Sequence, residues 1–250
     1  MDEATVMTKE ERRQARREER QAESARAQRR RSSRRVILWT TVVIVLAGIG
    51  WLMYRTAGTG SQTPSGTLAV PVTASDISTG PASASITLLE YADFECPACA
   101  AYSPIINQLL QDPQVAGKVR FVYRYFPLRN IHPNGQLSAQ AAQAAALQGK
   151  FWEMHDRLYE QQDAWAALSN AGARAKFVQY AQDLGLDVAR FDSDIDSDTV
   201  KAAVNADYDS AVASGVGETP TFFVDGIQLQ QPSSLDQFKQ EILNPGHANQ

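Results

Sequence analysis

The sequence predicts an α/β domain in which a small mixed sheet carries an inserted helical segment, with one transmembrane helix in front of the domain. Three observations predict this organisation. Residues 36–54 form an uncharged and mostly apolar stretch. Residues 85–128 show the pattern strand, helix, strand. Residues from about 135 to 215 have a helical pattern and precede a final pair of short strands.

Length and charge assign the first part of the chain to a membrane anchor. At roughly 1.5 Å per residue, the stretch 36–54 is just long enough for a hydrocarbon core of roughly 30 Å. Residues 1–35 hold 12 Lys and Arg against 7 Asp and Glu, and only Arg55 directly follows the span. The positive-inside rule therefore predicts a signal-anchor with a basic cytoplasmic tail and an extracytoplasmic domain. A cleaved signal peptide is the alternative, but no clear small-residue cleavage site follows Tyr54.

The segments on either side of the span lack the composition of a folded core. Residues 1–35 mix charges of both signs and predict a solvated tail, with binding to a partner or to nucleic acid as the alternative. Residues 55–79 are rich in Gly, Ser, Thr and Pro, which predicts a flexible linker. The folded domain is therefore expected to span residues 80–250.

The first half of this domain predicts a parallel strand pair joined by a helix. Residues 85–94 form a short apolar run typical of a buried strand, and residues 118–128 return to strand composition. Between them, apolar residues recur at helical spacing from Cys96 to Leu110. Pro97 suits the first position of that helix, whereas Pro104 is expected to kink it. This order implies a right-handed crossover.

The second half predicts helices followed by a hairpin. Residues from about 135 to 215 indicate three or four inserted helices. Phe151, Trp152 and Leu158 within them are expected in the core rather than on a binding surface. Asp225 and Gly226 then separate two short strands as a tight turn, and Ser234 is a plausible cap for a closing helix.

The two cysteines of the chain, Cys96 and Cys99, are separated by Pro97 and Ala98 at the expected helix start. Unpaired amides and the helix dipole favour a thiolate at Cys96, which predicts a lowered pKa and a nucleophilic role. Cys99 lies one turn deeper on the same face and is expected to be the buried resolving thiol. A zinc site would need about four ligands, and a bridge across two residues would remove little loop entropy. The spacing therefore favours a redox-active pair, with no metal and no cofactor.

Two further features surround this pair. Glu90 lies in an apolar strand, six residues before Cys96, where a buried carboxyl would have a raised pKa and could relay a proton to Cys99. A solvated Glu90 on an exposed strand is the alternative. Pro220 precedes an apolar strand, where the residues alone favour an ordinary trans bond after Thr219. Asp93 and Glu95 are expected on the surface.

The chain from about residue 80 to 243 resembles the DsbA-type thiol-disulfide oxidoreductases, which have a thioredoxin fold with an inserted helical domain. The stretches that carry the resemblance are "GPASASITLLEYADFECPACAAY", "YRYFPLRNIHPNGQLSAQAA", "GKFWEMHDRLY" and "GVGETPTFF". The resemblance implies that Cys96 attacks, that Cys99 resolves, and that the Thr219-Pro220 bond is cis. It also supports Glu90 as a buried proton relay.

Two departures bear on how strongly oxidising the pair is. Ala98 stands where the best-known family motif has histidine, and Glu218 stands where glycine is frequent. His132 matches a recurrent family segment and is expected to shape a loop rather than to titrate in catalysis.

The expected function is a membrane-anchored, extracytoplasmic oxidoreductase that forms disulfides in exported proteins. Cys96, Cys99 and Glu90 are its expected catalytic residues, and Pro97, Ala98, Thr219 and Pro220 are expected to support substrate binding. The resemblance also implies a DsbB-like membrane partner that reoxidises the pair. The alternatives are a reductase or isomerase kept reduced by a membrane electron carrier, and a non-catalytic peptide-binding or chaperone-like module.

Overall fold

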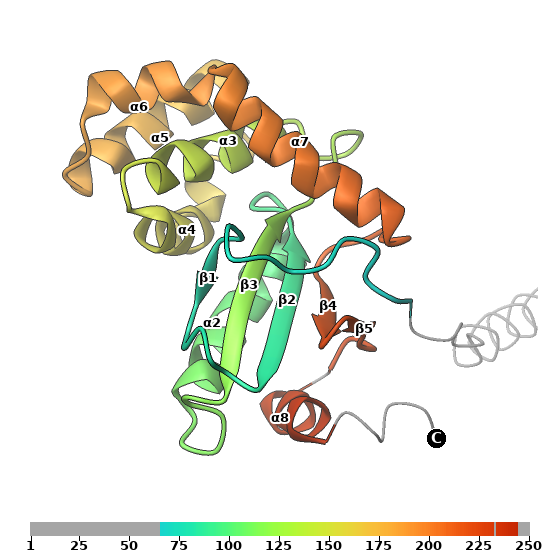
Figure 1. Cartoon of the computed structure of the whole chain (residues 1–250). Coiled ribbons are helices and arrows are strands. Elements are labelled where there is room, and N and C mark those ends of the chain that lie inside the picture. The colour runs from blue at the N-terminus through green and yellow to red at the C-terminus, as the bar shows by residue number, and fades with distance from the viewer. Residues whose placement is uncertain (1–65, 233, 245–250) are drawn as a thin grey trace, which may run out of the picture. The chain divides into compact units, whose positions relative to one another are not determined.

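The computed structural model describes residues 66–232 and 234–244 (Figure 1). The predicted cytoplasmic tail, the predicted span 36–54 and the first part of the predicted linker lie outside these residues. Within the described part, no helix is long and apolar enough to cross a membrane. The elements in chain order are β1 Ser78–Thr79, β2 Ile86–Ala92, α2 Pro97–Gln111, β3 Val119–Tyr125, α3 Gly135–Ala146, α4 Phe151–Glu160, the 3-10 turn η1 Gln162–Ala164, α5 Asn170–Asp183, α6 Val188–Ile195, α7 Asp198–Ala213, β4 Thr221–Val224, β5 Ile227–Gln228 and α8 Leu235–Leu243.

The five described strands form one sheet in the order β1-β3-β2-β4-β5. Strands β2 and β3 run parallel, with Glu90 opposite Tyr123, and α2 connects them. This confirms the predicted strand, helix, strand unit. Strand β4 pairs antiparallel with β2, which places Phe222 on the other side of Glu90. Glu90 is therefore in the middle of the sheet.

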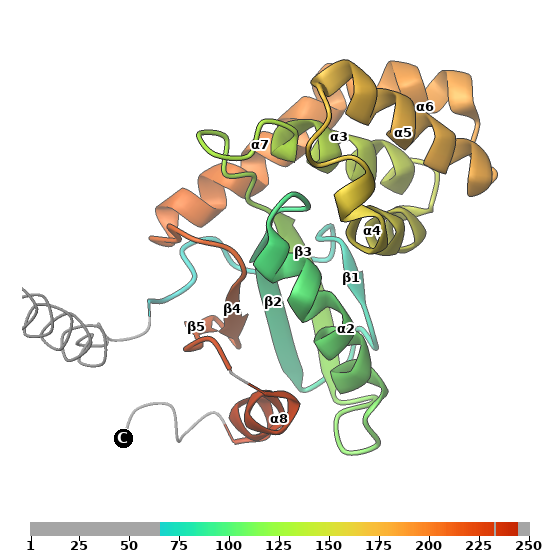
Figure 2. The ribbon, with the colours of Figure 1, turned by 180° about the vertical axis from the view of Figure 1, so that it is seen from behind.

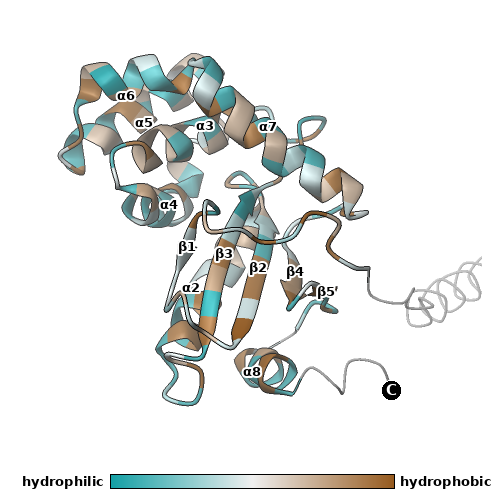
Figure 3. Ribbon diagram, viewed as in Figure 1, coloured by the Kyte–Doolittle hydropathy of each residue, from teal (hydrophilic) through white to brown (hydrophobic). Residues whose placement is uncertain are grey.

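The central strands are buried because both sheet faces are covered. Figure 3 shows β2 and β3 mostly brown, whereas the surrounding helices alternate between brown and teal. Helices α2 and α8 cover one face, as the reverse view shows (Figure 2), and Leu88, Ile106 and Phe238 share a core there. On the opposite face, Leu89 and Phe223 pack with Ala211 of α7. Such two-sided burial is typical of a sheet with parallel strands.

The inserted segment contains more helices than expected. Five α-helices, α3 to α7, and the turn η1 lie between β3 and β4, where three or four were predicted. Short polar caps separate the later ones, since Ser169, Asp187 and Ser197 each accept a hydrogen bond from an amide three residues on. Sequence periodicity merged these short helices because the breaks between them span only a few residues.

The packed domain begins before residue 80, earlier than expected. Residues 66–79, assigned to the linker from their composition, run along the domain and end in β1. The backbone amide of Leu68 donates to Gly226, and Arg124 donates to the carbonyls of Val70 and Pro71. Arg124 also forms a buried ion pair with Asp76 at 2.7 Å. These contacts link residues distant in the sequence, so local composition did not reveal them.

The C-terminal elements follow the prediction closely. Asp225 and Gly226 both have positive φ, 49° and 82°, as a two-residue hairpin turn requires. Ser234 caps α8 by accepting a hydrogen bond from Gln237.

Helix α2 continues through Pro104 to Gln111. Of the three residues expected in the helical core, Phe151 and Leu158 are buried and Trp152 is half-buried.

Candidate active site

Cys96 lies where the sheet meets α2. A turn after β2 lets the Cys96 amide donate to the carbonyl of Asp93 at 3.1 Å, and Cys96 becomes the extended N-cap residue of α2. Pro97 occupies the first turn of the helix, where a missing amide costs nothing. Pro97 and Ala98 are exposed, whereas Cys96 is 6% exposed. The pair is thus at the surface end of the helix, as the sequence predicts.

The environment separates the two thiols electrostatically. Hydrogen bonding from Cys99 lowers the pKa of Cys96 to about 5 against the effect of burial, with further contributions from the Thr219 side chain and from the amides of Cys99 and Ala98. Cys99 is fully buried, and burial raises its pKa well above the usual value. Both are free thiols in this structure. At pH 7 the arrangement holds a thiolate at Cys96 and a protonated thiol at Cys99.

The Thr219-Pro220 bond is cis and lies directly against Cys96. Sγ of Cys96 lies 3.3 Å from the carbonyl oxygen of Thr219, to which the protonated form of the thiol donates. The residues alone favoured a trans bond here, and the family resemblance implied the cis form that the structure contains. Thr219 and Pro220 are buried, while Glu218 beside them is exposed. The loop before β4 therefore forms one wall of the sulfur site.

Glu90 is buried inside the domain, at 3% exposure. Burial, with a smaller effect of the negative charge on Cys96, raises the pKa of Glu90 to about 8. Its charge in turn contributes to the raised pKa of Cys99, so the two groups sense each other. The solvated alternative for Glu90 does not hold. A carboxyl with a pKa near neutrality beside a buried thiol is suited to proton exchange.

Asp93 and Glu95 are buried, at 2% and 7% exposure, although the sequence placed both on the surface. Asp93 accepts hydrogen bonds from the amides of Glu95 at 2.9 Å and Leu128 at 2.7 Å, and it lies 2.7 Å from Nδ1 of His132. The loop after β3 therefore satisfies the carboxylate. Sequence reasoning missed this because two of the partners, Leu128 and His132, lie 35 and 39 residues away.

His132 belongs to the same network and also faces the sulfur site. Its hydrogen bond to Asp93 raises the pKa of His132, and the charges of Asp93, Cys96 and Glu95 act in the same direction. His132 therefore interacts electrostatically with Cys96 while it holds the loop. The sequence identified only the second of these effects.

The helical insertion supplies two hydrogen-bond donors that sequence reasoning did not identify. The Gln162 side chain of η1 donates to the carbonyls of Phe94 and Cys96, at 2.7 and 3.1 Å. The backbone amide of Asn134, just before α3, donates to the Glu95 carboxylate at 2.6 Å. Both contacts tie the helical insertion to the turn that carries Cys96. Glutamine and asparagine in a helical insertion gave no local signal of this role.

Metal binding has little structural basis in the described part of the chain. Among residues 66–232 and 234–244, no group of three or more His, Cys, Asp and Glu side chains is arranged to hold an ion.

A family model described as thioredoxin matches residues 73–244. The chain belongs to the thioredoxin family. The match covers the sheet, the cysteine pair and the whole helical insertion. For this thioredoxin-family protein, the predicted α/β fold with an inserted helical segment is thus confirmed.

Curated relatives of this family member share its domain within longer chains. The chain is 39% identical over 165 residues to a protein named Na(+)/H(+) antiporter NhaA 3 of Salinispora tropica, which covers 66% of this chain and 24% of that protein. It is 42% identical over 151 residues to the Na(+)/H(+) antiporter NhaA of Herminiimonas arsenicoxydans, covering 60% of this chain and 22% of that protein. The chain thus spans about a quarter of the length of the curated relatives it matches.

Solved structures of DsbA-type proteins share the fold of this thioredoxin-family domain. Oxidised BdbD from Bacillus subtilis aligns with a TM-score of 0.62 and 21% identity, over 72% of this chain and 96% of that chain. The α-DsbA1 protein of Wolbachia pipientis aligns with a TM-score of 0.61 and 19% identity, over 70% and 92% of the two chains. These likenesses show a DsbA-type fold, as the sequence predicted.

Proposed function

We propose that this protein is a membrane-anchored, extracytoplasmic thiol-disulfide oxidoreductase that forms disulfides in exported proteins. The observation that carries the proposal is the contrast between Cys96, with a pKa lowered to about 5, and the buried Cys99, with a raised pKa. A stable thiolate is a good leaving group, so the mixed disulfide at Cys96 resolves readily toward the reduced enzyme. The family and its fold support thiol-disulfide chemistry in general.

The reaction begins with the oxidised pair. A substrate thiolate attacks Sγ of Cys96, the Cys96-Cys99 bond breaks, and Cys99 leaves with the electron pair and takes a proton from the Glu90 carboxyl. A second substrate thiolate then attacks the substrate sulfur of the mixed disulfide, and Cys96 leaves as a thiolate. The substrate gains a disulfide, the enzyme holds one thiolate and one thiol, and Glu90 regains its proton from water.

Substrate polypeptide is proposed to bind beside the cis bond. The exposed Pro97 and Ala98 present a small, neutral surface at the start of α2. The backbone of Thr219 lies against Cys96, and we propose that it pairs with an extended substrate chain, a mode that reads backbone rather than sequence. Glu218 on the same loop is exposed and would disfavour acidic substrates.

The Cys96 thiolate supports the proposed direction of the reaction, in which the enzyme oxidises its substrate. With a pKa of about 5 at Cys96, the thiolate stabilises the reduced form at pH 7 by about 2 to 3 kcal/mol relative to an ordinary cysteine, which corresponds to about 50 mV. A stabilised reduced form makes the disulfide an oxidant. The alternative of a reductase or isomerase requires the pair to be kept reduced in cells, and a chaperone-like module requires no turnover at all.

The proposed location combines sequence and relatives. Residues 36–54 would anchor the chain with its amino terminus in the cytoplasm, and the domain would meet reduced proteins as they emerge. The matched relatives are named as antiporters, and ion antiport takes place across a membrane, which agrees with a domain that works beside one. A quinone-linked membrane partner of DsbB type is proposed to reoxidise the pair.

The redox state of the Cys96-Cys99 pair in cells, measured by thiol alkylation after acid quenching, tests the proposal. An oxidase is expected to hold Cys96 and Cys99 mostly as a disulfide, and Cys99→Ser is expected to accumulate mixed disulfides with exported proteins through Cys96. Cys96→Ser is the matched control and should accumulate none. A mostly reduced pair would favour the reductase or isomerase, and a double serine variant with unchanged oxidation of secreted proteins would favour the chaperone-like module.

A further inference from the structure

Glu90 lines a small cavity inside the domain. The cavity has a volume of about 30 Å³, and its polar lining comes from Glu90, Thr79, Ser103, Asn107 and His155. This volume is sufficient for at least one water molecule, and the polar lining offers that water hydrogen-bond partners. Among the described residues, no protein group donates a hydrogen bond to the Glu90 carboxyl. The carboxyl therefore faces a cavity that Ile106, Leu110, Phe121 and Trp152 also line, rather than a protein hydrogen-bond donor.

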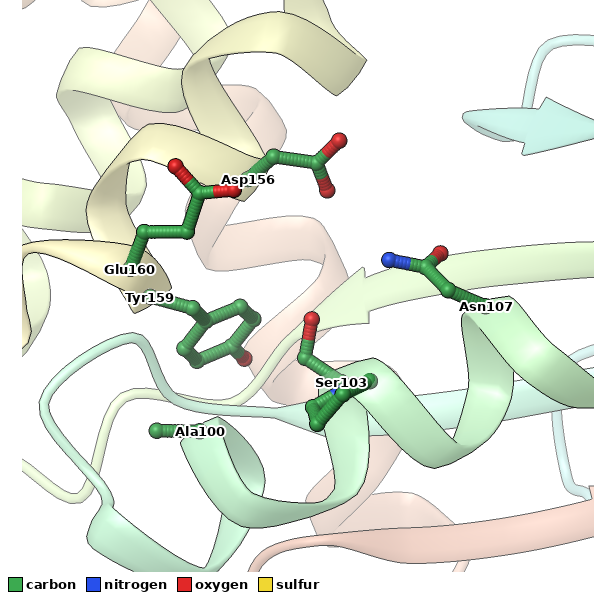
Figure 4. A pocket seen from close by; sticks show the side chains of 7 residues that line it. Ala100, Ser103, Asn107, Asp156, Tyr159 and Glu160 are labelled. Carbon is green, nitrogen blue, oxygen red and sulfur yellow. The ribbon is translucent and has the colours of Figure 1, made fainter.

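A second hollow lies between α2 and α4 and shares part of this lining. It has a volume of about 220 Å³, and its polar residues are Ser103, Asn107, Asp156, Tyr159 and Glu160. Figure 4 shows the Ser103 hydroxyl and the Asn107 amide reaching from α2 toward the carboxylates of α4. Ser103 and Asn107 line both spaces. One polar face of α2 thus separates the buried cavity from the outer hollow.

His155 provides a second connection between the two spaces. Its ring lines the inner cavity, and its Nδ1 lies 2.9 Å from Oδ1 of Asp156, which lines the outer hollow. The His155 side chain is 6% exposed, whereas the Asp156 side chain is 47% exposed. The pair therefore spans from the buried polar space to solvent within two adjacent residues of one helix.

Other titratable groups pack around His155. Tyr123 of β3 and Tyr159 of α4 pack edge-on against the ring, and their hydroxyls lie 3.2 Å apart. Burial raises the pKa of both phenols well above the usual value, so they remain protonated at neutral pH. Glu90 and Asp156 are the carboxyls that flank the ring on the inner and outer sides.

We propose that His155 with Asp156, assisted by Ser103 and Asn107, forms the route by which Glu90 exchanges protons with solvent. The inference rests on the proposed function, in which Glu90 gives a proton to Cys99 or takes one from it. In the reverse step, Cys99 loses its proton to the Glu90 carboxylate and attacks the mixed disulfide at Cys96, which expels the partner thiolate. Glu90 then delivers that proton to His155 and onward to solvent. His155 acts through Glu90 and contacts no reacting sulfur.

Packing alone is the competing account, because aromatic rings of Phe94, Phe151 and Trp152 also surround His155. A buried aromatic histidine could simply fill the core. The two accounts differ in what His155→Phe does, since phenylalanine keeps the ring volume and removes both nitrogens. If packing were the only role, this variant would leave the chemical steps unchanged.

Stopped-flow reaction of the reduced protein with oxidised glutathione separates the steps. Attack by Cys96 is bimolecular, and the following attack by Cys99 is unimolecular and needs the proton to leave. His155→Phe is expected to leave the first rate and the pKa of Cys96 unchanged and to slow the second step at pH 7 by about tenfold or more. Asp156→Asn should slow the same step less. Glu153→Gln, on the same helix but outside both hollows, is the matched control and should change neither rate.

Two further measurements distinguish a proton route from a structural effect. Added imidazole should restore the second step in His155→Ala, which opens space, and should not do so in His155→Phe. In a Glu90→Gln background, His155→Phe should have no additional effect, because the group it serves is absent. An unchanged second step in His155→Phe, or an equal slowing with and without Glu90, would overturn the proposed route. If Cys96 of the unsubstituted protein did not react with oxidised glutathione, that result would instead contradict the proposed function.

Discussion

Nδ1 of His132 lies 2.7 Å from Oδ2 of Asp93, so a loop after β3 brings a histidine to the turn that precedes Cys96. The charge of Cys96 contributes to the raised pKa of His132, so the two groups interact. In the dipeptide between the cysteines, Pro97 and Ala98 contribute no charge. The protein therefore places a histidine near Cys96 from outside the motif, rather than from within it.

Removal of this histidine is expected to make the pair less oxidising. His132→Gln keeps a donor for Asp93 but removes the imidazole that interacts with Cys96, so the pKa of Cys96 should rise by up to about one unit and the reduction potential should fall. Thiolate absorbance against pH measures the first quantity. Arg129→Gln serves as the control. It removes a cation from the same loop, and the Arg129 side chain stacks on Tyr208. An equal shift in both variants, or none in His132→Gln, would refute the assignment.

The buried Glu90 is expected to cost stability at neutral pH. The pKa of Glu90 is raised to about 8 in the folded state, against about 4.5 in the unfolded state. Ionisation of Glu90 therefore disfavours the folded state, and the free energy of unfolding falls as pH rises from about 4.5 to about 8. Glu90→Gln should therefore raise the free energy of unfolding by up to about 3 kcal/mol at pH 7 and by little at pH 4. Urea denaturation of the reduced protein at both pH values measures the difference. A gain that is independent of pH would contradict the raised pKa.

The two cysteine pKa values predict how the reduction potential depends on pH. Between pH 5.5 and 7, reduction should take up two electrons and one proton, because Cys96 remains a thiolate and Cys99 is protonated. The potential should then fall by about 30 mV per pH unit, and by about 59 mV per unit below pH 5. Equilibration with glutathione across this range provides the slopes. A slope near 59 mV at pH 6 to 7 would mean that Cys96 is not a thiolate there.

The buried ion pair between Arg124 and Asp76 is expected to hold residues 66–79 on the domain. Their side chains are 4% and 8% exposed, so Asp76→Asn leaves a buried guanidinium without its counter-charge and should cost about 2 to 4 kcal/mol. Asp192→Asn breaks an exposed pair with Arg174 and should cost less than about 1 kcal/mol. Denaturant unfolding compares the two. Similar losses in both variants would show that the Asp76 contact is not structural.

Local pattern was sufficient to predict the parts of this fold whose signals are local. The strand pair around α2 follows from hydrophobic periodicity, and the place of Cys96 at a helix start follows from the Pro97 signal. The turn at Asp225 and Gly226 is determined by two adjacent residues. The burial of Glu90 could be inferred because a single acid interrupts an apolar strand.

The parts that sequence could not predict depend on contacts across the chain. Asp93 and Glu95 are buried in the turn between β2 and α2, where the backbone amides of Leu128 and Asn134 donate hydrogen bonds to them from the chain that follows β3. Residues 66–79 have the composition of a linker, yet Arg124 on β3 holds them. The connection from Glu90 to Asp156 runs across two neighbouring spaces lined by residues of β2, α2 and α4, and no stretch of sequence contains it.

The reduction potential of the purified domain, equilibrated against glutathione at pH 7 with turnover on a reduced peptide, tests the central claim most directly. A disulfide oxidase should have a potential more positive than about −200 mV and should convert the peptide dithiol to a disulfide with loss of the Cys96-Cys99 bond. A potential near that of a reductase, about −270 mV, or a peptide that stays reduced in the presence of the oxidised domain, would contradict the account.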